Sequence, residues 1–158
     1  MKRHVLICGG GVIGVSIADF LSRRGIKATV IERTGIACAA SGKSGGFLAR
    51  DWCDGTPVQA LARRSFDLHA ELADRLGNKW GYRRLVTYGG FAPLRHRGPH
   101  APGWLSERVA VGRKLGSPET SAQVHPAKFT AAMMHAAKAQ EAELRIGLVT
   151  GFDTGAGR

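Results

Sequence analysis

Three glycines and one acidic residue near the start of the chain have the types and spacing needed to hold a nucleotide by its phosphates. The glycines are Gly9, Gly11 and Gly14, in the pattern G-x-G-x-x-G, and Glu32 follows the first of them after roughly twenty positions. The first glycine permits a tight turn, the second lets the backbone approach a pyrophosphate, and the third lets a helix pack closely on a strand. A carboxylate at position 32 accepts hydrogen bonds from a ribose 2′-OH and repels a 2′-phosphate. The pattern therefore favours FAD or NAD over NADP.

The elements around these residues are those that a dinucleotide-binding unit requires. Val5–Cys8 is a short apolar run of strand length, and Ala28–Ile31 is a second one. Between them, apolar residues at helical spacing over 13–21 predict a helix that Gly25 ends. The N-terminus of such a helix presents N–H groups and a positive dipole end to phosphates. The alternative is a glycine-rich turn without a ligand, with Glu32 as a solvated surface acid.

The length and composition indicate an ordinary globular protein with room for one domain. The chain has 158 residues, of which 44% are hydrophobic and 22% are charged. It contains no run of eighteen apolar residues, so no membrane-spanning helix is expected. Only Met1 to Arg3 precede the first expected strand, which leaves no room for a signal or transit peptide. We expect a cytoplasmic protein without a membrane partner.

The cysteines and histidines predict neither a disulfide nor a metal site. Cys8, Cys38 and Cys53 are odd in number and lack C-x-x-C spacing, which indicates a reducing compartment. Cys8 fits a buried strand, whereas the other two could be reactive thiols or small loop residues. His96 and His100 have no cysteine or carboxylate nearby in the sequence, so no metal is expected.

The net charge of +11 raises the possibility of nucleic-acid binding. The basic residues are scattered in pairs along the chain, however, and form no run of five to eight and no patch with interleaved aromatic residues. A solvated surface that attracts an anionic cofactor or substrate accounts for this charge. We therefore expect no nucleic-acid partner.

A loop of small residues over 34–50 follows the nucleotide-binding pattern. Its centre, A-S-G-K-S-G-G, spans 40–46 and contains two hydroxyls, a lysine and three glycines. Exposed backbone N–H groups in such a loop could form an anion nest or lie against a flat ring. A flexible surface loop is the alternative. The loop does not fit a Walker A motif, because Lys43 is not preceded by glycines in register.

The rest of the chain reads as further helices and strands separated by loops. The patterns predict a helix from Pro57 to Leu76, a strand over Leu85–Tyr88 that Gly89-Gly90 ends, a helix starting at Pro126, and a strand over Leu144–Val149. Pro93–Pro102, with three prolines, is expected to be an exposed loop. Trp104–Leu115 is compatible with a helix or a loop.

Taken together, three segments resemble one known family. They are G-G-G-V-I-G-V-S-I-A-D-F-L-S-R-R-G, V-I-E-R and A-A-S-G-K-S-G-G. The sequence is similar to the FAD-dependent oxidoreductases of the D-amino-acid oxidase and glycine oxidase superfamily. Later stretches, Y-R-R-L-V-T-Y, A-Q-V-H-P-A-K-F-T and L-R-I-G-L-V, look like a continuation of that pattern. The small-residue loop shifts the expected cofactor from NAD to FAD.

The resemblance implies a role for each matching position. The glycines of the first motif would hold the FAD pyrophosphate, Glu32 would bind the adenosine ribose beside Arg33, and the small-residue loop would lie along the pyrophosphate and flavin. A strand near Val149 would offer backbone groups to the adenine. The implied cofactor-binding residues are Gly9, Gly11, Val12, Ile13, Gly14, Glu32, Arg33, Ser41, Gly42, Gly45, Gly46 and Val149.

The resemblance also implies an architecture. We expect an α/β fold with a Rossmann-like FAD-binding domain, built from a βαβ unit and a parallel sheet, over 1–80 and 124–158. The segment 81–123 would begin an antiparallel substrate domain. Family members have further substrate-domain strands and a C-terminal glycine-rich FAD motif, which this sequence lacks. The chain therefore looks like the N-terminal portion of such an enzyme.

The implied activity is oxidation of an amine or a D-amino-acid-like substrate. In such enzymes the flavin accepts a hydride from the carbon that bears the amine, and O₂ then reoxidises the flavin, giving an imine and hydrogen peroxide. The sequence shows no Ser-His-Asp or paired-carboxylate arrangement, so no catalytic acid or base is predicted. A truncated, non-catalytic fragment that binds nucleotide or contacts a partner is the alternative.

Overall fold

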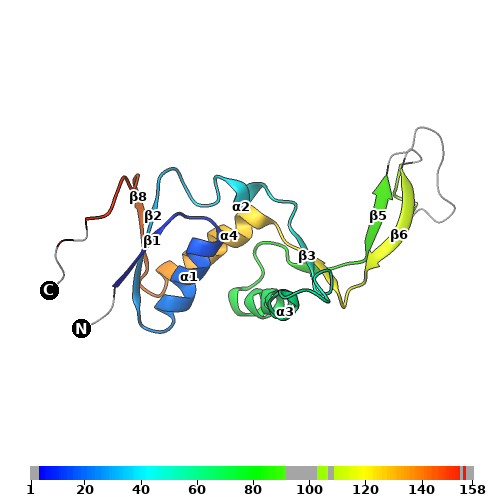
Figure 1. Cartoon of the computed structure of the whole chain (residues 1–158), viewed down its shortest axis with the longest axis horizontal. Coiled ribbons are helices and arrows are strands. Elements are labelled where there is room, and N and C mark those ends of the chain that lie inside the picture. Colours follow the sequence, from blue (N-terminus) through cyan, green and yellow to red (C-terminus); the bar gives the residue numbers. More distant parts are fainter. Residues whose placement is uncertain (1–3, 92–102, 107–108, 154, 156–158) are drawn as a thin grey trace. The chain divides into compact units, whose positions relative to one another are not determined.

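A computed structural model describes residues 4–91, 103–106, 109–153 and 155 (Figure 1). The chain divides into two compact units, each built from separate stretches of sequence. The first unit contains residues 1–46, 76–80 and 125–158, and the second contains residues 47–75 and 81–124. The expected functional boundaries at residues 80 and 124 stay a prediction.

The first unit is built on a parallel sheet of three strands. These are β1 (His4–Cys8), β2 (Lys27–Glu32) and β8 (Glu143–Ile146), in the order β1-β2-β8. Parallel pairing joins Ile7 to Val30 in one ladder and Val30 to Leu144 in the next. With α1 (Val12–Ser22) between the first two strands, this confirms the predicted βαβ unit.

Strand β8 is shorter than the sequence predicts. It ends at Ile146, which pairs with Glu32, whereas the apolar run had suggested a strand as far as Val149. A last backbone bond joins Gly147 N–H to Glu32 O at 2.9 Å. The ladder stops here because β2 itself ends at Glu32, which leaves Val149 beyond the sheet.

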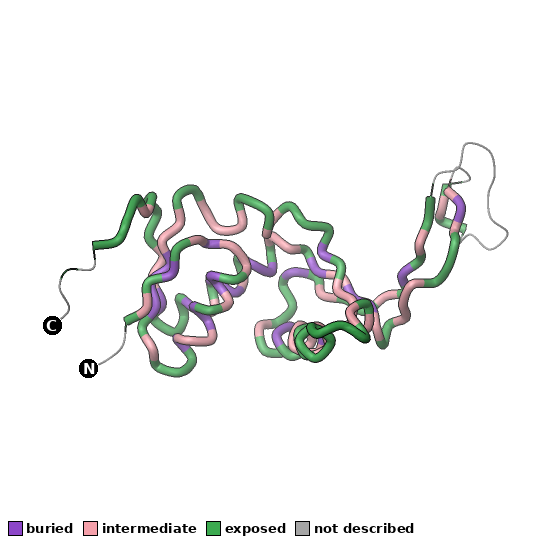
Figure 2. The backbone as a smooth tube through the Cα atoms, viewed as in Figure 1, coloured by how far each residue is buried: buried purple, intermediate pink, exposed green. Residues whose placement is uncertain are grey.

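Helices α1 and α4 (Pro126–Lys138) pack against one another and against the sheet, where they bury the core of the first unit (Figure 2). Several side chains in this core are fully inaccessible to solvent, namely Val15, Ala18, Ala28, Val30, Met133 and Ala137. As predicted, α4 begins at Pro126, and its N-cap is His125. Trp80 adds an edge-to-face contact with Phe129, with ring centroids 5.4 Å apart.

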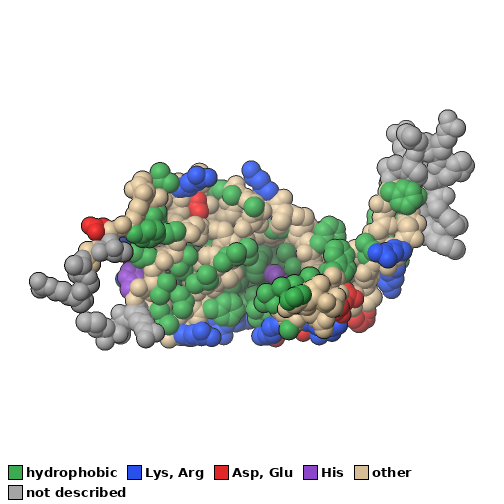
Figure 3. Space-filling model, viewed as in Figure 1, with side chains coloured by type: hydrophobic (Ala, Val, Ile, Leu, Met, Phe, Trp, Pro, Cys, Tyr) green, Lys and Arg blue, Asp and Glu red, His purple; other side chains and the backbone are tan. Residues whose placement is uncertain are grey.

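The buried face of α1 is not the face with the largest apolar side chains. Ile13 is 74% exposed and Ile17 is 44% exposed, and hydrophobic side chains gather over this helix in Figure 3. The buried residues of α1 are Gly14, Val15, Ala18, Asp19 and Ser22. Small residues recur every four positions on this face, so the helix backbone can approach its neighbours closely.

The strands of the second unit pair antiparallel. One sheet contains β3 (Phe47–Ala49), β7 (Ser121–Gln123) and β4 (Arg83–Arg84), in the order β3-β7-β4. A separate pair joins β5 (Thr87–Phe91) to β6 (Ala110–Gly116). The stretch Trp104–Leu115, which the sequence left open between a helix and a loop, therefore ends in strand β6.

Strand β5 continues where the sequence predicted a stop. The predicted end at Gly89-Gly90 is wrong, because both glycines pair with β6 and the strand runs to Phe91. The register shifts between Gly89 and Gly90, which is the behaviour of glycine at a β-bulge. The predicted loop over Pro93–Pro102, with His96 and His100, lies outside the described residues.

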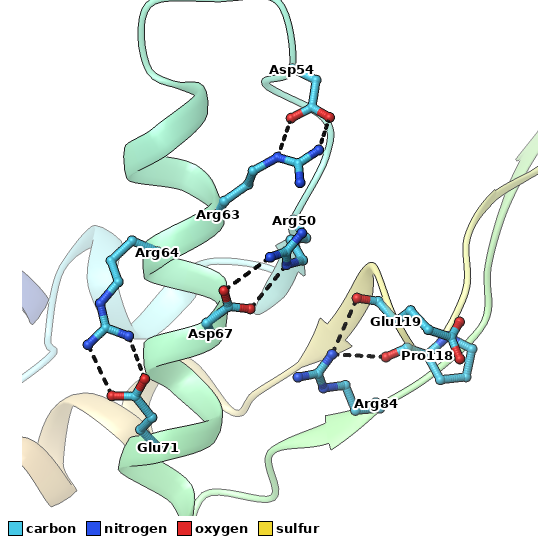
Figure 4. A network of polar contacts seen from close by, with 9 residues as sticks. All are labelled: Arg50, Asp54, Arg63, Arg64, Asp67, Glu71, Arg84, Pro118 and Glu119. Atoms are coloured by element: carbon cyan, nitrogen blue, oxygen red, sulfur yellow. Dashed lines mark hydrogen bonds and ion pairs between the residues drawn. The ribbon is translucent and has the colours of Figure 1, made fainter.

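Helix α3 (Gln59–Leu76) carries a network of ion pairs (Figure 4). It starts two residues later than predicted, and the Gln59 side chain accepts a hydrogen bond from Gly55 N–H. Asp67 accepts two bonds from the Arg50 guanidinium, at 3.1 and 3.2 Å, which joins the helix to the residue after β3. The guanidinium of Arg84 lies over the Phe66 ring, with its carbon 4.6 Å from the centroid.

No helix among the described residues combines the length and the apolar character needed to cross a bilayer.

Candidate functional site

The turn between β1 and α1 has a backbone that requires glycine. Gly9 has φ of +107°, a conformation that L side chains rarely adopt, and its N–H donates to Ile31 O at 2.8 Å. A Cβ on Gly14 would lie 2.1 Å from Gly9 O and 3.2 Å from Ile7 Cγ2. The third glycine of the motif therefore lets α1 approach the turn and β1, as the sequence predicts.

The carboxylate of Glu32 is fixed against this turn by hydrogen bonds. Gly10 N–H donates to Oε2 at 2.7 Å, while the backbone N–H and the hydroxyl of Thr34 donate to Oε1 at 2.9 and 3.0 Å. These donors, with Gly10 N–H contributing most, lower the pKa of Glu32 to about 2. Glu32 is therefore an oriented anion at neutral pH.

Gly10 is needed for this contact as well. A Cβ at Gly10 would lie 2.6 Å from Ile36 Cδ1 and 3.1 Å from Glu32 Cγ. A larger residue would push the glutamate side chain and the following loop away from the turn. The middle residue of the G-G-G run thus brings the end of β2 against the end of β1.

The small-residue loop lies against the same turn and forms the short helix α2 (Ala40–Lys43). Ser41 Oγ accepts a hydrogen bond from Val12 N–H at 3.0 Å, so it satisfies one N–H group at the start of α1. Ala37 N–H donates to Gly10 O at 3.2 Å. A Cβ on Gly42 would lie 2.0 Å from Ala37 O, which explains a glycine at that position.

A cavity of about 590 Å³ opens between these segments, at the carboxyl ends of the three parallel strands. This is the position at which open α/β sheets bind ligands. The predicted site residues that line it are Gly9, Gly11, Glu32, Arg33, Ser41 and Val149. The predicted site residues that are not among its described walls are Val12, Ile13, Gly14, Gly42, Gly45 and Gly46. Gly14 and Gly42 instead have the packing roles given above.

Several residues of the cavity wall were not predicted from the sequence. They are Cys8, Gly10, Ile31, Thr34, Gly35, Ala37, Cys38, Ala39, Gly147 and Leu148. Thr34 belongs to no sequence motif that would have marked it in advance. The contribution of Gly147 and Leu148 depends on the pairing of β8 with β2, which joins distant parts of the sequence.

No group of three or more histidine, cysteine or acidic side chains among the described residues could hold a metal ion. The walls combine one fixed carboxylate, several backbone N–H groups and small side chains. Such a surface fits a nucleotide with a pyrophosphate and a ribose.

Comparison with known proteins identifies the family of this chain. The sequence profile of the family described as FAD dependent oxidoreductase matches residues 4–158. The chain belongs to the FAD-dependent oxidoreductase family. The resemblance found in the sequence is thereby confirmed, and so is FAD as the expected cofactor.

The curated relatives of this FAD-dependent oxidoreductase family member are considerably longer. A putative oxidoreductase of Schizosaccharomyces pombe is 38% identical over 141 residues, which cover 81% of this chain and 37% of the relative. The bifunctional protein ThiO/ThiG of Trichormus variabilis is 40% identical over 118 residues, which cover 73% and 17% of the two chains. The chain thus spans well under half the length of these relatives.

Solved structures show the same fold. Glycine oxidase from Bacillus cereus has a TM-score of 0.76 and 28% identity, over 92% of this chain and 47% of that one. Iminodiacetate oxidase from Chelativorans has a TM-score of 0.67 and 19% identity, which supports the fold alone. The expected α/β class, with a parallel nucleotide-binding sheet and an antiparallel segment, is confirmed.

Proposed function

We propose that this protein binds FAD in the cavity at the carboxyl ends of β1, β2 and β8 and oxidises an amine or amino acid, with O₂ as the electron acceptor. The observation that supports this proposal most directly is the fixed carboxylate of Glu32. Its oxygens are held by Gly10 N–H and Thr34, and the same residues line the cavity. An anion fixed beside a glycine turn suits a ribose diol next to a pyrophosphate.

The roles of the other residues follow from their places in the wall. Gly11 leaves open backbone beside the start of α1, where N–H groups and the helix dipole favour phosphate oxygens. Ser41 lies next to Gly11 and adds a hydroxyl, which can donate to a phosphate while it accepts from Val12 N–H. Leu148 and Val149, beyond β8, provide backbone groups and apolar surface for an adenine.

Bound FAD supplies the redox chemistry, because its flavin ring can accept a hydride and pass electrons to O₂. The chain itself binds and orients the cofactor through the contacts above. No side chain of the described residues is assigned as an acid or base. In this proposal, residues 1–80 and 124–158 bind the cofactor, and residues 81–123 belong to the substrate domain.

We propose the substrate class from one similar solved structure and from the net charge of the chain. Among the solved structures, the one with 28% identity is a glycine oxidase. The net charge of +11 attracts anions, and an amino-acid carboxylate is one. A small-molecule partner in the cytoplasm, rather than a nucleic acid or a membrane, remains our expectation.

The first experiment is the visible absorbance spectrum of the purified chain after incubation with FAD and gel filtration. Retained flavin absorbance is the expected result. The control is the Gly11→Ala variant treated identically, which should retain less. A wild-type chain that emerges colourless at FAD concentrations far above micromolar would contradict the cofactor site.

The second experiment tests the reaction on the flavin-loaded protein. Anaerobic addition of glycine, D-alanine or a secondary amine should bleach the flavin absorbance, and air should restore it with release of hydrogen peroxide. Retained flavin that no amine bleaches would contradict amine oxidation. That outcome would leave the alternative of nucleotide binding without turnover.

A further inference from the structure

Two cysteine residues line the proposed nucleotide cavity. Cys8 ends β1 and Cys38 lies in the loop before α2. Both are free and exposed, so the expectation that Cys8 is buried is wrong. Among the described walls of the cavity are Cys8 and Cys38, but not Cys53. Cys53 belongs to the second unit, so its thiol serves as an internal control in a labelling experiment.

The position of Cys38 is set by the backbone on its N-terminal side. Ala37 has a left-handed backbone, with φ of 61°, and its N–H donates to Gly10 O at 3.2 Å. The Cys38 sulfur lies 3.9 Å from Ile36 O, and a Cβ on Gly35 would come within 3.0 Å of it. The thiol therefore lies close to the loop that follows Glu32.

The position of Cys8 follows from the alternation of side chains along β1. Ile7 is buried, and its Cγ2 lies on the side where α1 packs. Successive residues of a strand point to opposite faces, so the side chain of Cys8 projects away from that helix. Cys8 pairs with Ile31, directly before the turn at Gly9 and Gly10. Its thiol is thus at the strand end from which the nucleotide site opens.

We propose that Cys8 and Cys38 form a modification site that is mutually exclusive with the nucleotide. A bound FAD covers both thiols, and a group attached to either sulfur occupies volume that the cofactor needs. The inference rests on the proposed FAD site. Because coupling between two binding events is reciprocal, slower thiol modification by FAD requires weaker FAD binding after modification.

The same site gives the proposed oxidase a route to inactivation by its own product. Hydrogen peroxide is the oxidant, and a thiolate sulfur attacks one of its oxygens, so that an S–O bond forms as the O–O bond breaks. The sulfur is oxidised to a sulfenic acid, and the other peroxide oxygen leaves as water after protonation. Because bound FAD covers the thiols, oxidation takes place while the cofactor is dissociated, and the oxidised chain then rebinds FAD more weakly.

The test begins with thiol labelling of the full chain by N-ethylmaleimide, with and without saturating FAD. Peptide mass spectrometry follows the three cysteines separately. FAD should slow labelling of Cys8 and Cys38 by about tenfold or more, a typical size for coupled sites. Cys53 should react at the same rate in both samples. The same design with hydrogen peroxide, and dimedone to trap sulfenic acid, should give the same pattern.

The reciprocal measurement is FAD affinity before and after labelling, by quenching of flavin fluorescence. Labelled wild-type chain should lose FAD binding by about tenfold or more. The Cys8→Ser/Cys38→Ser double variant should have the same FAD affinity before and after labelling. A Cys53→Ser variant is the matched control and should lose binding as the wild type does.

The outcomes separate this inference from the proposed function. FAD affinity of the unlabelled chain is measured first, and its absence would overturn both proposals. If the unlabelled chain binds FAD, then equal affinity after labelling, or protection of only one of the two thiols, overturns the paired site while the proposed function stands. Equal protection of Cys53 also overturns it, because the effect would then be a general stabilisation.

Discussion

The N–H of Gly10 donates to Glu32 Oε2 at 2.7 Å and so joins the turn after β1 to the last residue of β2. Gly10 is not one of the three motif glycines, yet it is the largest contributor to the low pKa of Glu32. The glycine turn and the Glu32 carboxylate are therefore one hydrogen-bonded structure.

The first prediction concerns the pH dependence of stability. The pKa of Glu32 is about 2 in the folded chain, against an ordinary value of 4.5, so the ionised form stabilises the fold. This contribution is fully present above pH 4.5 and is lost as the pH falls toward 2. Glu32→Gln should therefore be less stable than wild type at pH 7, with a difference that shrinks below pH 4.5. Urea unfolding at a series of pH values measures it. A constant difference down to pH 2 would refute the assignment.

The second prediction separates the two donors of Thr34. Thr34→Val removes the hydroxyl but keeps the backbone N–H, so the pKa of Glu32 should rise while remaining below its ordinary value. Thr34→Ser keeps a hydroxyl and is the matched control. NMR titration of the Glu32 carboxyl carbon reports the pKa directly. Identical titration of the two variants would show that the hydroxyl contributes nothing.

The third prediction concerns Gly11 and FAD affinity. A Cβ at Gly11 would lie 3.0 Å from Ser41 Oγ and would occupy the approach to the start of α1. Gly11→Ala should weaken FAD binding by about tenfold, equivalent to about 1.4 kcal/mol. Gly151→Ala is the control, since no described atom lies within 4 Å of a Cβ there. Flavin fluorescence titration compares them, and equal affinities would remove Gly11 from the site.

The fourth prediction concerns Gly14, which acts through packing. Its Cβ would lie 2.1 Å from Gly9 O, a backbone atom that cannot move without shifting the turn. Gly14→Ala should lower the free energy of unfolding by about 1–3 kcal/mol. Gly11→Ala, with a neighbour that is a rotatable hydroxyl, should cost less stability than this. Chemical denaturation of both variants tests the order, and the reverse order would contradict the geometry.

The fifth prediction concerns the second unit. Phe66 is 2% exposed, and Arg84 lies over its ring. Phe66→Ala should cost about 3–5 kcal/mol, through the cavity it leaves and the lost ring contact. Phe66→Leu keeps most of the volume and should cost less. Thermal unfolding compares the two, and equal losses would mean that the ring fills no packed space.

Local signals account for what the sequence could predict. The βαβ unit was recognisable because its strands are short apolar runs and its turn needs glycine at defined positions. Helix α4 could be predicted from Pro126, which fits the first turn of a helix. The buried face of α1 could not, because small residues rather than Ile13 and Ile17 make the close contacts.

The site was predictable only in part for the same reason. Gly9, Gly11 and Glu32 belong to a sequence pattern, and all three line the cavity. Gly10 and Thr34 carry no such signal, because their role is to meet the Glu32 carboxylate once β1 and β2 have paired. The residues after β8 line the cavity because β8 pairs with β2, from which it is far removed in the sequence.

The parallel sheet has a consequence for how the chain acquires its structure. Strand β2 ends at Glu32 and its neighbour β8 begins only at Glu143, with the whole second unit between them. The closure entropy of such a long loop must be overcome before the third strand pairs, and non-local pairing of this kind is slow. We therefore expect the cavity to be completed late in folding, and an unfolded second unit makes the loop that has to close effectively longer. The first unit should therefore refold more slowly when the second unit is unfolded.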